Sequence, residues 1–340
     1  MSDKSQLNTI RTLSGKKFFQ DENESILSSA EKNNIFLPYS CKNGRCSTCK
    51  CRLISGQTDI DSNELGLSDK EKKEGWILSC VRFAKSDIVI DVEDFGDLKI
   101  PRANVYPCKI SEINYLTNDV LQVILRFPPN VNFSFIPGQY LDIIGPNNTK
   151  RSYSIANNFQ DNLIELHIKN VPGGLLSNYW FNQAKIDDLL RMYGPKGTFF
   201  IRKNIPKKII FLATGTGIAP VLSMIEGLRS SKINLKKQVS VFWGARFNED
   251  LYVDKFKHLL DKCNFFPVLS KPDKEWEGIQ GYVQNALIEK NYNLKNASVY
   301  ACGSDAMIRS AEEILIKSGL EMDNFYSDAF LPSAPQEVSD

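Results

Sequence analysis

Residues 41–51 read CKNGRCSTCKC, and this short stretch holds four of the eight cysteines of the chain. Three of them have the spacing C-x4-C-x2-C, and the next cysteine beyond the stretch lies in the sequence WILSC at residues 76–80. Two irons bridged by two sulfides need four thiolates, so one tight loop can supply three and a distant segment the fourth. The spacing therefore predicts a [2Fe–2S] cluster. Its predicted ligands are Cys41, Cys46, Cys49 and Cys80.

The pattern resembles that of plant-type ferredoxins, in which a glycine such as Gly44 lets backbone N–H groups approach the sulfurs. A zinc site with four thiolates is the alternative, but zinc ribbons usually pair two C-x2-C knuckles, which this sequence lacks. Cys51 is expected to be a small core residue on the strand that leaves the loop. Cys108 and Cys263 have no partner motif and are expected to be buried structural cysteines.

Composition limits the kind of protein. With 340 residues, the chain is too long for one ordinary core, so two or three domains are expected. The net charge is +2 and no basic block interleaves with aromatic residues, so composition gives no case for nucleic acid. The amino end, MSDKSQLNTIRTLSGKK, lacks an apolar core and does not resemble a signal peptide. No apolar run approaches about 18 residues. A cytoplasmic protein with reduced thiols is therefore expected.

The elements around the cysteines predict a small mixed sheet crossed by a helix. Residues 5–95 resemble a plant-type ferredoxin domain of β-grasp fold. Ser68 and Glu71 form the sequence signature of a capping box that opens a short helix. The other expected elements are a hairpin (9–13 and 16–20), a helix (25–32) and two strands (51–54 and 88–92).

In the rest of the chain, the pattern of apolar residues and turn signals changes near residue 205. Before it, short alternating strands with turn signals predict an antiparallel barrel. After it, apolar strands alternate with helical stretches, which predicts a parallel sheet covered by helices. The expected barrel strands are 106–113, 120–127, 140–144 and 163–169. The later strands are 208–213, 239–244, 265–269 and 298–302, with helices 219–229 and 305–317. The fold class is thus multidomain α+β and α/β. The expected domains are 1–95 (cluster), 96–102 (linker), 103–204 (FAD-binding barrel), 205–330 (NAD-binding α/β) and 331–340 (tail).

An ordered set of short motifs carries a resemblance in the second part of the chain. RSYS at 151–154, GGLLS at 173–177, GPKGTF at 194–199 and TGTGIAP at 214–220 follow one another. The last lies between a strand and a helix but lacks the third glycine of the Rossmann fingerprint. Together the motifs resemble those of the ferredoxin–NAD(P) reductase superfamily over residues 103–330.

The resemblance implies a flavin site on the barrel. Arg151 would hold the FAD pyrophosphate, Tyr153 would stack on the isoalloxazine, and Ser154 would hydrogen-bond near the N5 atom that accepts hydride. The opening of the helix at Gly174 would offer free N–H groups to phosphate. The remaining implied contacts are Ser152, His167, Ile168, Lys169, Gly173, Leu175 and Ser177. For 167–169, ordinary barrel residues are an equally good interpretation.

The resemblance also implies a nicotinamide site at the tight turn of TGTGIAP, where the pyrophosphate of NADH can approach the backbone. Its implied contacts are Thr214, Gly215, Thr216, Gly217 and Pro220. Cys302-Gly303-Ser304 matches a C-terminal C-G motif near the nicotinamide, although a serine replaces the usual proline, and a structural Cys302 is the alternative. Phe330 would cover the flavin face, or simply pack in the last core layer. The nicotinamide contacts end with Cys302, Gly303 and Met307, and the implied catalytic residues are Ser154, Cys302 and Phe330.

A narrower resemblance concerns the acceptor. SCKNGRCSTCK, RSYSIAN, GPKGTFF and the ending SDAF are similar to the reductases of CDP-6-deoxy-Δ3,4-glucoseen, which serve a CDP-6-deoxyhexulose 3-dehydrase in 3,6-dideoxysugar synthesis. It implies electron flow from NADH through FAD and the cluster to that partner protein. Reductase components of aromatic-ring oxygenases share the domain order and are the alternative. A non-enzymatic electron carrier is a third interpretation, which the intact TGTGIAP and CGS motifs disfavour. Glu249 and Asp250 would repel a 2′-phosphate, so NADH is expected over NADPH, with Arg246 the one possible phosphate ligand.

Overall fold

The computed structural model describes residues 7–21, 24–96, 98–158, 162–203, 207–229, 231 and 233–331. These residues divide into two compact units, one up to Ile100 and one from Pro101 onward. The division falls within the predicted linker. Of the predicted tail, only Leu331 lies within the described residues. The exact domain bounds stay a prediction.

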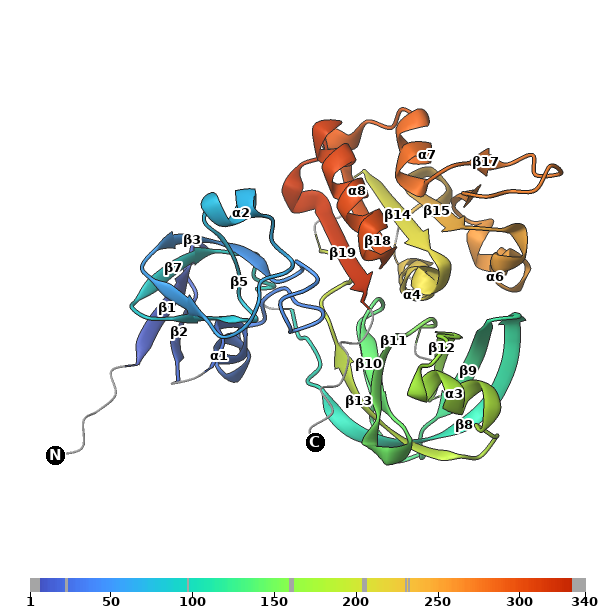
Figure 1. Ribbon diagram of the computed structural model, residues 1–340, viewed down its shortest axis with the longest axis horizontal. Coiled ribbons are helices and arrows are strands. Elements are labelled where there is room, and N and C mark those ends of the chain that lie inside the picture. Colours follow the sequence, from blue (N-terminus) through green and yellow to red (C-terminus); the bar gives the residue numbers. More distant parts are fainter. Residues whose placement is uncertain are drawn as a thin grey trace. The chain divides into compact units, whose positions relative to one another are not determined.

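The first unit contains a five-stranded mixed sheet in the order β2-β1-β7-β3-β5 (Figure 1). β1 pairs antiparallel with β2 and parallel with β7, while β3 pairs antiparallel with β5 and β7. A separate ribbon joins β4 and β6. The core under the sheet is apolar and includes Ile10, Phe18 and Ile90, which have no exposed surface. The elements are β1 (Asn8–Thr12), β2 (Lys17–Gln20), α1 (Ile26–Lys32), β3 (Lys50–Ser55), β4 (Thr58–Ile60), α2 (Asp69–Lys73), β5 (Trp76–Leu78), β6 (Arg82–Ala84) and β7 (Ile88–Asp91).

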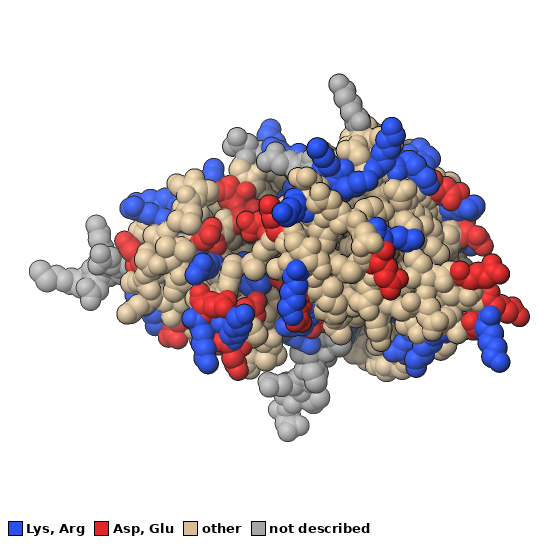
Figure 2. All heavy atoms as spheres, turned by 90° about the horizontal axis from the view of Figure 1, so that it is seen from above, with Lys and Arg blue, Asp and Glu red and all other residues tan. Residues whose placement is uncertain are grey.

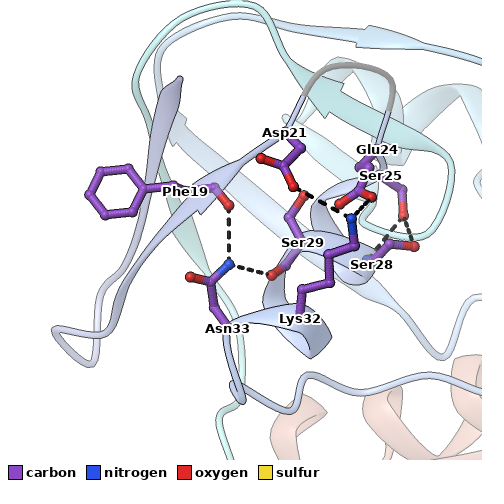
Figure 3. Close-up of polar contacts among 8 residues, drawn as sticks. All are labelled: Phe19, Asp21, Glu24, Ser25, Ser28, Ser29, Lys32 and Asn33. Carbon is purple, nitrogen blue, oxygen red and sulfur yellow. Dashed lines mark hydrogen bonds and ion pairs between the residues drawn. The ribbon is translucent and has the colours of Figure 1, made fainter. Parts of the chain in front are cut away.

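Helix α1 confirms the predicted helix and is tied at both ends by side chains (Figure 3). At its start, the Ser25 hydroxyl accepts the N–H of Ser28 at 3.1 Å, as an N-cap does. At its end, the Asn33 amide donates to the carbonyl of Ser29 at 2.8 Å and to that of Phe19 in β2 at 3.2 Å. The same amide therefore closes the helix and fixes it to the sheet.

Helix α2 begins with the expected capping box. The Ser68 hydroxyl accepts the N–H of Glu71, and the Glu71 carboxylate accepts the N–H of Ser68 at 2.8 Å. The carboxylate also pairs with Lys50 at 2.9 Å, which links the helix to β3.

The second unit begins with a six-stranded antiparallel sheet in the order β11-β10-β13-β8-β9-β12. Its two edge strands meet at an isolated bridge between Ile155 and Leu166, which closes the sheet toward a barrel. Helix α3 (Leu175–Asn182) packs against this core through Trp180, which is 2% exposed. The strands are β8 (Asn104–Thr117), β9 (Val120–Arg126), β10 (Tyr140–Ile144), β11 (Lys150–Ser154), β12 (Leu163–Lys169) and β13 (Leu189–Lys196), and η1 covers Pro146–Asn148.

A six-stranded parallel sheet in the order β17-β16-β15-β14-β18-β19 follows (Figure 1). Alternate residues of β14 face opposite sides, so Ile209 and Phe211 join the core that α4 and α6 cover. Helices α7 and α8 contact each other and the strands β15, β18 and β19. The elements are β14 (Lys208–Thr214), η2 (Gly215–Gly217), α4 (Ile218–Arg229), α5 (Leu235–Gln238), β15 (Val239–Ala245), η3 (Asn248–Asp250), α6 (Val253–Leu260), β16 (Asn264–Leu269), β17 (Ile279–Gln280), α7 (Val283–Glu289), η4 (Leu294–Asn296), β18 (Ala297–Ser304), α8 (Asp305–Lys317), η5 (Met322–Asn324) and β19 (Phe325–Phe330).

The barrel and the parallel sheet share one core within this unit. Val120 of β9 and Phe199 after β13 lie in the same buried cluster as Phe211 and Trp243 of the parallel sheet. Across the same seam, the Ser223 hydroxyl of α4 donates to the carbonyl of Asn157 at 2.7 Å. The two sheets are therefore held as a single packed body.

The surface and the helices agree with the composition. On the face shown in Figure 2, acidic and basic side chains are interspersed, as a net charge of +2 suggests. None of the helices in the described part of the chain has the length and apolar character needed to cross a membrane.

Candidate cofactor sites

The four predicted cluster ligands lie in two pairs. The sulfurs of Cys49 and Cys80 are 3.1 Å apart, and the N–H of Cys41 lies 3.4 Å from the sulfur of Cys46. A hydrogen bond from the Cys46 thiol, followed by backbone N–H groups of the loop, lowers the pKa of Cys41 to about 6. The hydrogen bond with Cys49 likewise lowers the pKa of Cys80, helped by the N–H of Gly44. Each pair thus has one thiol that ionises readily.

This arrangement suits two metal ions with two thiolates each. Within the described ranges, no three thiol, imidazole or carboxylate groups lie close enough together to hold a metal ion, so the case for the cluster rests on the two thiol pairs. Gly44 has φ +74°, and a Cβ there would lie 2.4 Å from the carbonyl oxygen of Asn63, so glycine is required where its N–H reaches Cys80. Cys51 is 1% exposed, and burial raises its pKa to about 12, as for a neutral core thiol. The donor set and its cradle fit a [2Fe–2S] cluster.

Strand β11 places the RSYS residues along one edge of the barrel. Arg151 is partly exposed, and its guanidinium donates to the carbonyl of Lys150 at 2.7 Å. The Ser152 hydroxyl donates to the Asp142 carboxylate on β10 at 2.7 Å. These contacts fix the start of the strand, and among the described residues no hydrogen bond occupies the other guanidinium nitrogens of Arg151, which could bind an anion.

The next two residues of the strand are more buried, and Tyr153 packs against the barrel core. The Tyr153 hydroxyl accepts the indole N–H of Trp180 at 3.1 Å, and the two rings meet edge to face. Burial raises the pKa of Tyr153 to about 12, so its hydroxyl stays protonated. Ser154 is 7% exposed and ends the strand. A flavin at this edge would meet a fixed tyrosine ring and a hydroxyl beside it.

His167 lies on β12, but its side chain faces the seam between the two sheets. The imidazole is fully buried, with Nε2 2.9 Å from the Glu165 carboxylate and Nδ1 3.1 Å from the Tyr252 hydroxyl. Burial alone would raise the pKa of Glu165, but the hydrogen bonds of His167 and Gln122 lower it. Any cofactor contact of His167 must therefore come from its backbone. Ile168 is also buried, and Lys169 pairs with Asp119 at 2.6 Å.

The start of α3 offers backbone donors to a ligand. Gly174 is the N-cap and supplies no side-chain acceptor. Gly173 has φ +75°, and Leu175 is 61% exposed. The Ser177 hydroxyl is already engaged, because it accepts the N–H of Val171 at 2.7 Å. The first N–H groups of the helix can therefore bind an anion such as phosphate.

The glycine turn after β14 lies where the strand order of the parallel sheet reverses. Chain order runs from β14 to β15 on one side and to β18 on the other, and ligands bind at such a switch point beyond the carboxyl ends of the strands. A Cβ at Gly217 would lie 2.3 Å from the carbonyl oxygen of Cys302. A Cβ at Gly303, with φ +140°, would lie 2.0 Å from the Thr214 hydroxyl. Gly215 has no atom within 4 Å of its Cβ position, so its open side is free for a ligand.

The other predicted contacts of this turn divide by burial. Thr216 lies in η2 beside Gly215, and both residues are partly exposed. Gly217 is buried at the end of η2, and Pro220 is buried in the first turn of α4. A pyrophosphate could therefore reach Thr216 and Gly215, whereas the Pro220 ring packs inside the unit and shapes the start of the helix. The contacts of all four residues with NADH stay a prediction.

A residue outside the predicted motifs also supports the glycine turn. The buried Trp243 of β15 donates its indole N–H to the carbonyl of Gly215 at 2.9 Å. Tyr252 packs edge to face on the indole, with ring centroids 4.7 Å apart, and bonds His167 through its hydroxyl. A chain of contacts therefore runs from the barrel strand β12 to the glycine turn. No local pattern marks it, because its members lie far apart in sequence.

The end of β18 explains the departure from the family's proline. Ser304 is the N-cap of α8, and its hydroxyl accepts the N–H of Met307 at 3.3 Å. Its own N–H donates to the Thr214 hydroxyl at 3.2 Å. Cys302 is fully buried, and burial raises its pKa far above the usual range, so its thiol is neutral. Phe330 pairs with Ser304 across the strands and is 38% exposed at the same sheet edge.

Three family models match consecutive parts of the chain. The 2Fe-2S iron-sulfur cluster binding domain matches residues 11–85. The oxidoreductase FAD-binding domain matches residues 107–201, and the oxidoreductase NAD-binding domain matches residues 211–313. The chain is therefore an iron–sulfur flavoprotein oxidoreductase that uses a [2Fe–2S] cluster, FAD and NADH.

Whole-chain relatives have the same organisation. The CDP-6-deoxy-L-threo-D-glycero-4-hexulose-3-dehydrase reductase of Yersinia pestis is 42% identical over 94% of this chain and 97% of its own length. Protein RfbI of Salmonella typhimurium is 37% identical over 93% of this chain and 94% of its own. Phenol hydroxylase P5 protein of Acinetobacter pittii is 32% identical over 92% of this chain and 91% of its own.

A solved structure shares the fold over nearly the full length of this chain. The Amycolatopsis cytochrome P450 reductase GcoB superposes with a TM-score of 0.74, at 23% identity, over 96% of this chain and 100% of that one. The chain belongs to the ferredoxin–NAD(P) reductase superfamily, in the group that carries an amino-terminal 2Fe-2S domain and includes the Yersinia pestis reductase.

Proposed function

We propose that this chain passes electrons from NADH, through FAD and the [2Fe–2S] cluster, to a pyridoxamine-phosphate-dependent CDP-6-deoxyhexulose 3-dehydrase of 3,6-dideoxysugar synthesis. The observation that carries the proposal is the 42% identity to the Yersinia pestis reductase across nearly the whole of both chains. When bound, FAD accepts a hydride and releases electrons singly, which suits a donor of two electrons and a one-electron cluster. The electrons delivered to the dehydrase would complete removal of the sugar 3-hydroxyl.

The protein's own part is to hold the groups, and no acid–base residue is required. Cys41, Cys46, Cys49 and Cys80 would ligate the cluster, because their thiols already lie in two pairs. Serine at any of the four should strip or weaken the visible cluster absorption. Cys51→Ser is the control and should leave it. Iron loss from Cys51→Ser together with retention in Cys80→Ser would reverse the assignment.

The flavin would lie along β11 and the start of α3. Arg151 and the N–H groups after Gly174 would bind its pyrophosphate, with Tyr153 against the ring and Ser154 near N5. The switch point supports the nicotinamide site, since no atom lies within 4 Å of the Cβ position of Gly215, directly after β14. The buried thiol of Cys302 would contribute shape rather than a proton or a nucleophile.

A reconstituted assay tests the acceptor. The holoenzyme, NADH, the dehydrase and its CDP-6-deoxyhexulose should give the 3-deoxy product, with NADH consumed in proportion. An aromatic-ring oxygenase is the second candidate acceptor, because phenol hydroxylase P5 protein matches at 32% identity over most of both chains. If the dehydrase draws no electrons and the oxygenase does, that candidate replaces the first.

We also infer a cytoplasmic setting. All eight cysteines are free thiols in the structure, including the buried Cys108 and Cys263. Reduced thiols are the ordinary state in that compartment. Fractionation of cells that express the tagged chain tests this directly.

A further inference from the structure

Glu64 is a buried carboxylate beside the cysteine loop that the electron-transfer scheme does not use. It is 4% exposed and lies between the ribbon strand β4 and α2 in sequence. Its carboxylate accepts the backbone N–H of Leu78 at 2.9 Å. The Arg82 guanidinium binds the same carboxylate at two points, with Nε at 3.0 Å and Nη2 at 2.6 Å. A forked contact of this kind fixes orientation as well as distance.

The two partners of Glu64 flank the fourth cluster ligand. Leu78 precedes Cys80 by two residues and Arg82 follows it by two. The backbone between them is short, so holding both ends limits where the Cys80 sulfur can lie. One further tie, the N–H of Ser79 to the carbonyl of Cys49 at 3.1 Å, joins the same segment to the loop through main-chain atoms.

The segment that carries Glu64 also holds the loop of the other three cysteines. The carbonyl oxygen of Asn63 lies over Gly44, where a Cβ would come within 2.4 Å. The N–H of Gly66 donates to the carbonyl of Gly44 at 2.8 Å, and the Ser47 hydroxyl donates to the carbonyl of Gly66 at 2.6 Å. Residues 63–66 are thus fastened to the loop on one side and to the Cys80 segment on the other.

We propose that Glu64 is a positioning residue for the cluster, which sets Cys80 at the correct spacing from the three-cysteine loop. This inference rests on the ligand set proposed above. Cluster binding needs two thiol pairs at a fixed separation, and the bonds of segment 63–66, together with the Ser79 tie, connect the two ligand-bearing segments. The Glu64 side chain is 2% exposed and that of Arg82 is 22% exposed, so loss of Arg82 would leave a buried carboxylate without its cation, which is costly.

The test is the rate of cluster loss from the holoenzyme, followed by visible absorption after addition of an iron chelator. Glu64→Gln keeps an acceptor for Leu78 but removes the charge that Arg82 binds. Changes around metal ligands commonly cost roughly 10- to 100-fold in metal affinity, and we expect an increase in the loss rate of that order. The electron paramagnetic resonance spectrum of the reduced cluster should also change, because the Cys80 sulfur is less firmly placed.

Glu71→Gln is the matched control. Glu71 is a carboxylate of the same unit that also pairs with a cation, Lys50, and caps a helix, but it does not contact residues 78–82 in any described bond. It should leave the cluster loss rate within about twofold of the wild type, a margin well below the change expected from an altered ligand shell. Equal rates for Glu64→Gln, Glu71→Gln and the wild type would overturn the proposal.

A double variant separates a positioning effect from destabilisation by an uncompensated charge in the single variant. Glu64→Met with Arg82→Met removes both charges, leaves neither buried alone, and keeps similar volume. The contacts of Leu78 and Arg82 with the Glu64 carboxylate are still missing, so faster cluster loss is expected again. Wild-type retention in the double variant would show that only charge compensation mattered, and would refute positioning. Cys80→Ser separates the two proposals. If this variant retains the wild-type spectrum, the proposed ligand set is wrong. If Cys80→Ser loses the cluster while Glu64→Gln loses it at the wild-type rate, only the positioning role of Glu64 is refuted.

Discussion

Replacement of Gly217 by alanine should separate the glycine turn from the end of β18. The added Cβ would lie 2.3 Å from the carbonyl oxygen of Cys302 and 2.7 Å from its carbonyl carbon. Both neighbours are backbone atoms of a central strand, so no flexible side chain can move aside. The contact must open by about 0.7 Å to reach 3.0 Å, and overpacking of this kind costs about 1–3 kcal/mol.

The turn is the part that can yield, because β18 is paired on both sides. If NADH binding must restore the native turn, the same free energy is lost from binding. With 1.4 kcal/mol for each factor of ten, NADH should bind about 5- to 150-fold more weakly. FAD content should stay normal, since the FAD contacts expected on β11 and α3 are elsewhere.

Rapid-mixing measurement of flavin reduction across an NADH series gives the apparent dissociation constant and the limiting rate separately. Gly319→Ala is the control: it has φ +97°, so it strains the backbone, but no atom lies within 4 Å of its Cβ position. The control should lower the melting temperature only slightly and leave NADH binding unchanged. Wild-type NADH dependence in Gly217→Ala, with an unaltered melting temperature, would refute this reasoning.

Three further predictions concern the nicotinamide side of the molecule. NADH should exceed NADPH in kcat/KM by about tenfold or more, since Glu249 is exposed and Asp250 follows it beyond the end of β15, and equal values with ferricyanide as acceptor would contradict this. Phe330→Ala should change the rate of flavin reduction by NADH while reoxidation through the cluster stays nearly constant; unaltered reduction would count against a gating role. Trp243→Phe removes one hydrogen bond to Gly215, worth about 0.5–1.5 kcal/mol, so half-saturation should need roughly 2- to 10-fold more NADH. An unshifted half-saturation would show that the indole does not hold the turn.

Local sequence patterns predict the exact first and last residues of several elements. β10, β12 and α8 have the bounds expected from alternation and from the helical pattern. The capping box at Ser68 could be predicted because its two partners lie three residues apart. Where one short window contains all the interacting groups, the sequence is sufficient.

Longer-range contacts account for what the sequence did not reveal. The alternation predicts a strand over 106–113, whereas β8 runs from Asn104 to Thr117. Register shifts after Ile110 and Tyr115 interrupt the alternation and hide the carboxyl-terminal part of the strand. The family motif predicts His167 on a strand beside the flavin, but it does not predict that the imidazole pairs with Tyr252, which lies 85 residues away. Burial and partners of this kind depend on the assembled fold, so only the positions of the residues, and not their orientations, could be inferred.

The seam between barrel and parallel sheet bears on how such proteins can be recombined. The Tyr252 ring and the His167 imidazole meet edge to face across it, and Ser223 closes on the Asn157 carbonyl nearby. A chimaera that joins the barrel of one relative to the nucleotide half of another would have to inherit both sides of these contacts. Residues up to Ile100 form a separate compact unit with a hydrophobic core of its own. The contacts across the seam therefore require that the flavin and nucleotide halves be exchanged together.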